Sequence, residues 1–73
     1  MDKAISVSTR LLKDGEWFVA FSPEFPEANG QGKTREEALD SLREAIFLLL
    51  EDRREDARAE LGEGEQLELL SFA

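Results

Sequence analysis

The chain has 73 residues, enough for one small domain (residues 1–73) and close to the lower size limit for folding without disulfides or metals. It contains no cysteine and no histidine, which excludes disulfides, Cys/His zinc sites and catalytic pairs built on a thiol or an imidazole. Acidic residues outnumber basic ones 17 to 9, and the resulting net charge of −8 disfavours binding to nucleic-acid phosphates.

The first third of the chain is predicted to form strands. Apolar or β-branched residues alternate with polar ones at Ile5, Val7, Thr9 and Leu11, the period of a half-buried strand. The Lys13-Asp14-Gly15 run predicts a hairpin turn. Residues 16–22 then form a second strand with Trp17 on one face and Phe18 on the other. Because both faces are apolar, we expect both to be covered in the working protein.

Two prolines follow the second strand and interrupt the strand pattern. Pro23 and Pro26 each lack a backbone N–H and have a fixed φ, so they predict a corner. A short third strand is expected over residues 30–33, where two glycines weaken strand propensity.

A long helix is predicted over residues 35–61. Thr34 and Glu37 have the spacing of a capping box, and Gly62 is a natural stop. One stripe of apolar residues follows at helical spacing: Ala38, Leu39, Leu42, Ala45, Ile46, Leu49 and Leu50. At 1.5 Å per residue this helix is roughly 40 Å long, whereas a seven-residue strand spans about 23 Å. The charged end beyond Leu50 must therefore overhang the sheet or kink.

Residues 66–72 are predicted to form a last strand, which completes the order β-β-β-α-β. A right-handed crossover would place this strand parallel to the first, in spatial order 3-2-1-4. The expected fold is therefore a two-layer α+β domain: a mixed four-stranded sheet with one long helix on one face.

Four large apolar residues exceed what one helix on one sheet face can bury, and they predict a partner surface: Trp17, Phe18, Phe47 and Leu48. Taken singly, each is more simply interpreted as core or corner packing. Taken together, they predict a homodimer or larger assembly.

The second half of the predicted helix carries four acidic residues: Glu51, Asp52, Glu55 and Asp56. The simplest interpretation is a solvated helix face that favours solubility. Paired carboxylates also suit a calcium site or a general acid and base, and an acidic face suits the docking of a basic partner protein. Residues 34–73 hold 5 basic and 12 acidic residues, a net charge of −7, against −1 for residues 1–33.

A run of ten positions from strand two to the helix start resembles the HicB family of bacterial antitoxins and their short relatives. These positions are Gly15, Trp17, Ala20, Pro23, Phe25, Pro26, Gly32, Thr34, Glu37 and Ala38. The resemblance spans roughly residues 5–50. It implies a partial RNase H-like α+β fold and neutralisation of a small RNA-cleaving toxin of the HicA type; such toxins bind phosphates and tend to be basic.

The chain departs from this family pattern in two places. Glu27 stands where the family commonly has glycine after the second proline, and no helix-turn-helix or ribbon-helix-helix segment follows the last expected strand. Many family members bind DNA through such a segment. We therefore expect no direct binding of nucleic acid by this chain alone.

Other functions find weaker support in the sequence. An RNase H-like nuclease needs a carboxylate on its first strand, and there is none between Lys3 and Asp14. Gly32-Lys33-Thr34 mimics the end of a phosphate-binding loop, but Glu27 stands where that loop needs a glycine. We expect no cofactor, no metal and no enzymatic activity. The main alternative to an antitoxin is a self-associating structural or regulatory module without a toxin partner.

The termini and the apolar runs indicate location. Residues 1–4 lack the pattern of a signal peptide, and the longest apolar run, residues 45–50, is far too short to cross a bilayer. We expect a cytoplasmic protein without membrane contact.

Overall fold

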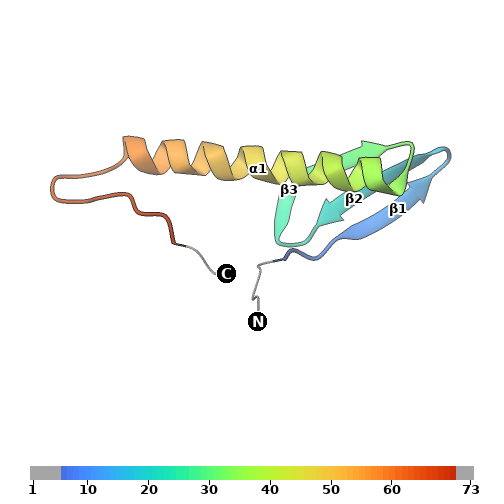
Figure 1. Ribbon diagram of the computed structural model, residues 1–73, viewed down its shortest axis with the longest axis horizontal. Coiled ribbons are helices and arrows are strands. Elements are labelled where there is room, and N and C mark those ends of the chain that lie inside the picture. Colours follow the sequence, from blue (N-terminus) through green and yellow to red (C-terminus); the bar gives the residue numbers. More distant parts are fainter. Residues whose placement is uncertain (1–5, 71–73) are drawn as a thin grey trace.

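The computed structural model describes residues 6–70, and that part of the chain folds into two layers. The elements are β1 (Arg10–Asp14), β2 (Trp17–Ser22), β3 (Phe25–Gly32) and α1 (Arg35–Ala59). The three strands form one antiparallel sheet with β2 in the centre, and α1 lies across one face of that sheet, mainly over β3 (Figure 1).

Two tight turns set the strand register. Asp14 pairs with Trp17 across the first turn, where Gly15 has a φ of +62° that a side chain would strain. Ser22 pairs with Phe25 across the second, where the fixed φ of Pro23 suits the first corner position. The register shifts between Phe21 and Ser22, and this irregularity lets the edge strand β3 contain Pro26.

The start of α1 has the side-chain caps expected of a capping box. The Glu37 amide donates to the Thr34 hydroxyl at 3.1 Å, and the Glu37 carboxylate accepts from the Lys33 amide at 2.8 Å. The carboxylate thus reaches one residue further back than in the standard motif. These two hydrogen bonds fix where β3 ends and where the helix begins.

The core between the sheet and α1 is built from small residues. Ala20, Ala28, Ala38 and Leu42 are buried, and larger side chains such as Phe18 and Phe25 pack around them half-buried. A Cβ at Gly32 would lie only 2.9 Å from the Ala38 amide nitrogen, so helix and strand meet almost backbone to backbone. The layers are close because their contact residues are alanine and glycine.

The predicted four-stranded mixed sheet of order 3-2-1-4 is wrong, although the α+β class holds. Residues 66–70 pair with no strand, and residues 71 and 72 of the expected strand lie outside the described residues. The cause is the length of α1, whose C-terminal end projects well beyond the sheet (Figure 1). A turn occupies residues 60–65, closed by the Glu65 amide on the Gly62 carbonyl at 3.1 Å. Residues 66–70 span about 17 Å when extended. They therefore lie beneath the projecting end of α1 and do not reach the sheet.

The other element boundaries also differ from the sequence expectations. The first strand lies at residues 10–14 instead of around residues 5–11, where Ile5 is outside the described residues. The third strand runs from residue 25 to 32, far longer than the expected residues 30–33. The helix ends at residue 59 instead of 61 and continues as one element, so its charged end overhangs the sheet.

Candidate interaction surfaces

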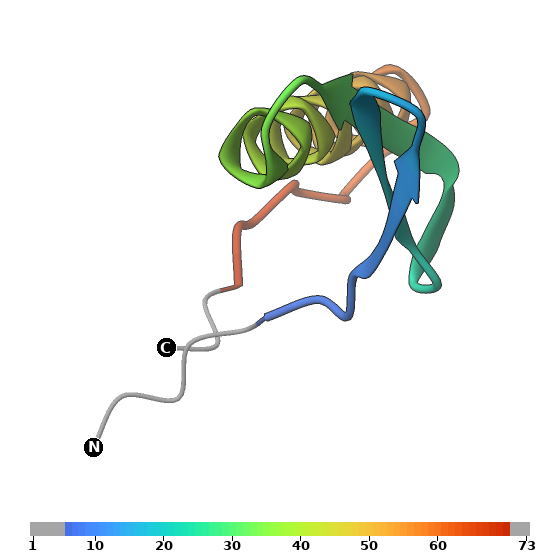
Figure 2. The same cartoon turned by 90° about the vertical axis from the view of Figure 1, so that its right-hand side faces the viewer.

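The strand register divides the sheet into a face covered by α1 and a face that α1 does not touch. Residues on the covered face include Leu11, Phe18 and Ala20, which pack into or against the core. The opposite face, here called the open sheet face, carries Arg10, Leu12, Asp14, Trp17, Val19, Phe21, Asn29 and Gln31. Figure 2 shows α1 and the C-terminal segment on the same side of the sheet, which leaves the other side uncovered.

Large apolar side chains are exposed on the open sheet face. Leu12 is 56% exposed, Trp17 44% and Phe21 41%. The Lys33 ammonium lies 5.9 Å from the centre of the Trp17 ring, a cation–π distance. An apolar cluster with a polar border is the usual composition of a protein-binding surface.

The four residues predicted to form one partner surface lie in three places. Trp17 is on the open sheet face, whereas Phe18 is half-buried on the covered face with the Lys13 ammonium 5.8 Å from its ring centre. Phe47 and Leu48 are exposed on α1, at 58% and 57%. Sequence reasoning missed Leu12 because it placed the first strand too early; in β1 its two-residue spacing puts it on the same face as Arg10 and Asp14.

The acidic helix end, defined as Glu51, Asp52, Glu55 and Asp56, lies on the part of α1 that projects beyond the sheet (Figure 1). Glu51 accepts a hydrogen bond from Arg54 at 2.8 Å, and Glu55 pairs with Arg58. Among the ion pairs of residues 6–70, none includes Asp52 or Asp56. Two of the four carboxylates are therefore neutralised locally, and two present their charge to solvent.

The overhanging helix is attached to β3 by one arginine. Arg53 pairs with Glu27, and its guanidinium carbon lies 6.0 Å from the centre of the Phe25 ring. Glu27 is the residue that replaces the glycine common in HicB-like sequences. In this chain it links the edge strand to the helix within the acidic helix end, at Arg53 between Asp52 and Glu55.

Nine of the ten residues of the HicB-like pattern occupy structural positions in this fold. Trp17 is the exception, because its ring lies on the open sheet face. The others form turns, caps and close contacts, as the buried Ala20 and Ala38 illustrate. The pattern therefore describes mainly how strand two is joined to the helix, although Pro23 and Pro26 also line a shallow hollow beside Arg10 and Phe21.

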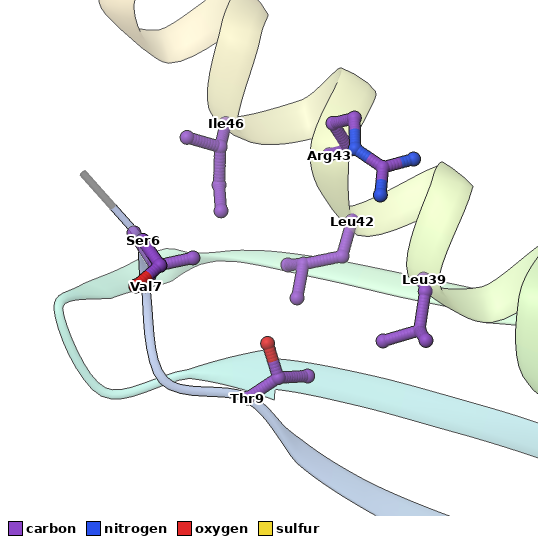
Figure 3. Close-up of a pocket in the computed structure, with 7 residues that line it drawn as sticks. All are labelled: Ser6, Val7, Thr9, Leu39, Leu42, Arg43 and Ile46. Atoms are coloured by element: carbon purple, nitrogen blue, oxygen red, sulfur yellow. The ribbon is translucent and has the colours of Figure 1, made fainter. Parts of the chain in front are cut away.

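A groove of about 410 Å³ lies between the N-terminal segment and α1 (Figure 3). It is lined by Ser6, Val7, Thr9, Leu39, Leu42, Arg43 and Ile46. Arg43 is the one charged residue among them, and it pairs with Asp40. Among the described residues no carboxylate lines the groove, so this lining offers no carboxylate as general acid or base.

One carboxylate outside both surfaces has an altered pKa. Hydrogen bonds from Ser8, and a smaller contribution from Ser22, lower the pKa of Glu24 below its ordinary value of 4.5, although desolvation opposes them. The Glu24 carboxylate accepts from the Ser8 amide at 2.8 Å and from the Ser22 hydroxyl at 3.1 Å. It ties the N-terminal segment to the turn between β2 and β3.

The part of the chain that the structure describes has neither a metal-binding cluster nor a membrane-spanning helix. Within residues 6–70, no group of three or more acidic, cysteine or histidine side chains is arranged to hold a metal ion. The single helix of that region lacks the apolar length that crossing a membrane requires.

Comparison with known proteins gives one clear relative. The chain is 53% identical over 63 residues to a UPF0150 protein of Synechocystis sp., and the aligned region covers 86% of each chain. No family model matches the chain. No solved structure matches it either.

Proposed function

We propose that this chain, which belongs to the UPF0150 family, is a non-enzymatic protein-binding domain of the antitoxin type. Its partner would be a small, basic, RNA-cleaving toxin, which it neutralises by covering the RNA-binding surface. The HicB-like pattern from Gly15 to Ala38 supports this class of function.

The observation that carries the proposal is the division of charge along the chain. Residues 34–73 carry a net charge of −7, and the acidic helix end projects beyond the sheet, where a partner can approach it. A protein that cleaves RNA must bind phosphates and is therefore usually basic. Opposite charge accelerates the encounter of two such proteins and orients it.

Asp52 and Asp56 allow the sharpest test. Because neither takes part in an ion pair of the described residues, their reversal to lysine breaks no arginine contact. The probe is the small basic protein that this proposal expects to be encoded next to the gene for this chain, in purified form. We expect Asp52→Lys/Asp56→Lys to slow association with it roughly tenfold at low salt, with a much smaller effect at high salt.

A matched control separates local docking from net charge. Glu16→Lys/Glu36→Lys changes the net charge by the same amount at exposed positions away from the acidic helix end. It should slow association far less. Equal slowing by both variants, or no slowing by either, would contradict docking at the acidic helix end.

A second candidate function is a self-associating structural or regulatory module without a toxin partner. The open sheet face favours it, because Leu12, Trp17 and Phe21 are exposed together on one side of the molecule. The two candidates make different predictions: only an antitoxin protects RNA from the neighbouring gene product. Metal-dependent RNA cleavage by the pure chain would contradict both.

A further inference from the structure

The open sheet face has a layout that is complementary to a reversed copy of itself. Its residues form three rows across the strands, because the register pairs them in order. The first row is Arg10, Phe21 and Asn29; the middle row is Leu12, Val19 and Gln31; the last row is Asp14 and Trp17, with Lys33 over the ring. Both end rows hold one charged residue of β1 and one aromatic residue of β2.

We propose that this face is the interface of a homodimer in which two sheets pack face to face about a two-fold axis perpendicular to the strands. Such an axis reverses the strand direction, so it places the middle row on itself and exchanges the end rows. Leu12 meets the partner's Leu12 near the axis. Trp17 faces the partner's Phe21, and Arg10 faces the partner's Asp14.

The pairs formed in this way are favourable in charge and in shape. Each dimer gains two Arg10–Asp14 pairs and two Trp17–Phe21 contacts, while aliphatic side chains fill the centre. A two-fold axis parallel to the strands would instead place β1 over the partner's β3, so that Arg10 faces the partner's Asn29. Only the reversed arrangement brings Arg10 of one copy opposite Asp14 of the other.

The distribution of charge over the whole chain also points to a second copy as the occupant. Two chains of net charge −8 repel each other, but residues 1–33, which hold the sheet, carry only −1. Pairing through the open sheet face brings these nearly neutral halves together. In each chain α1 lies on the side of the sheet away from this face (Figure 2), so in such a dimer both acidic helix ends stay accessible to a basic partner.

The size of the face sets the strength of the association. Three strands about 4.8 Å apart and five residues long cover roughly 250 Å², well below the ~800 Å² per partner of a standard interface. The dimer is therefore weak and reversible, which makes its formation measurable by dilution.

Substitutions at Arg10 and Asp14 test contacts between two chains, because these residues do not interact with each other within one chain. They are four residues apart on one strand, about 13 Å along β1, and form no ion pair with each other. Arg10→Asp and Asp14→Arg should each weaken the dimer roughly tenfold, because each puts like charges face to face twice. The double variant R10D/D14R reverses both partners and should restore the dimer to within about twofold of the wild type.

The measurement is sedimentation equilibrium combined with fluorescence. Trp17 is the one tryptophan in the chain, so its emission reports directly on this face. We expect the mass to approach that of a dimer as concentration rises, with a parallel shift of emission to shorter wavelength. Leu12→Glu should abolish both changes, whereas Phe47→Ser, an equally exposed position on α1, should leave both unchanged.

Several outcomes would overturn the proposal. They are a monomer at every concentration, a dimer whose Trp17 emission does not shift, a double variant that stays as weak as the single ones, or a dimer lost in Phe47→Ser and kept in Leu12→Glu. Circular dichroism melting of each variant shows that a lost dimer is not a lost fold. None of these results depends on toxin binding, so this inference and the antitoxin proposal can fail separately.

Discussion

Gly30 lies directly under the backbone of Ala38. A Cβ on Gly30 would stand 2.6 Å from the Ala38 carbonyl oxygen and 2.9 Å from the Leu42 Cα. Both are main-chain atoms of α1, so neither can rotate away. The glycine is what allows β3 to approach the helix at this distance, and the alanine core around it depends on that approach.

The substitution Gly30→Ala should therefore destabilise the fold strongly. We expect a loss of about 3 kcal/mol in the free energy of unfolding, because helix and strand must separate to admit one methyl group. Urea denaturation followed by circular dichroism measures it. Gly62→Ala makes the same chemical change in the exposed turn after α1 and should cost well under 1 kcal/mol. Equal stability of the two variants would contradict the close packing of β3 on α1.

Removal of the helix cap should have a smaller effect. Thr34→Ala deletes the hydroxyl that accepts from the Glu37 amide, and N-cap deletions typically cost about 1 kcal/mol. Thermal melting provides the comparison with the wild type. Glu36→Ala, a neighbouring change in the first helical turn, serves as the control and should cost less. If the order were reversed, helix capping by Thr34 would not govern the start of α1.

The hydrogen bonds of Glu24 predict a pH dependence at the N-terminal segment. The pKa of Glu24 is lowered in the folded chain, so its stabilising contribution is complete above the ordinary value of 4.5 and is lost as pH falls through the lowered folded value. The Ser8 amide resonance should shift over that acidic window. Glu24→Gln should remove the shift, whereas Glu16→Gln should keep it. A Ser8 amide that is unchanged throughout this window would contradict the contact.

Arg53 is expected to stabilise the overhanging helix modestly. Arg53→Ala removes the pair with Glu27 and the contact with the Phe25 ring, together worth about 1 kcal/mol at an exposed site. Hydrogen exchange of α1 amides near residue 53 should increase more than exchange near residue 38. Arg58→Ala, which breaks a pair within the helix, is the control. Uniform change along α1 in both variants would argue against a local attachment to β3.

The parts of this fold that the sequence predicted well are those decided by local chemistry. Thr34 and Glu37 mark the helix start, and the continuous run of apolar residues from Trp17 to Phe21 marks β2. The glycines of β3 have low strand propensity, so the sequence predicted only a short strand there. Strand propensity takes no account of the close helix approach that a glycine in a strand allows. Gly30 and Gly32 are small for that reason.

The missing fourth strand shows where local pattern is insufficient. Residues 66–70 alternate like a strand, yet Leu69 and Leu70 are 72% and 78% exposed and pair with nothing in the described chain. Whether they can reach the sheet depends on the overhang of α1, a property of the whole domain. Trp17 and Phe18 lie on opposite faces of β2, as neighbouring strand residues do, and Phe47 lies on α1. Only the packing of α1 on one sheet face shows that these residues form no single surface.

The central claim, that this chain acts by binding a basic RNA-cleaving protein, is tested most directly by an RNA-cleavage titration. The purified product of the adjacent gene is mixed with a labelled RNA and with increasing amounts of the chain. We predict that cleavage falls linearly and stops when the two proteins reach equal amounts, while the chain alone cleaves nothing. Undiminished cleavage with the chain in large excess, or a neighbouring protein that cleaves no RNA, would contradict the antitoxin assignment.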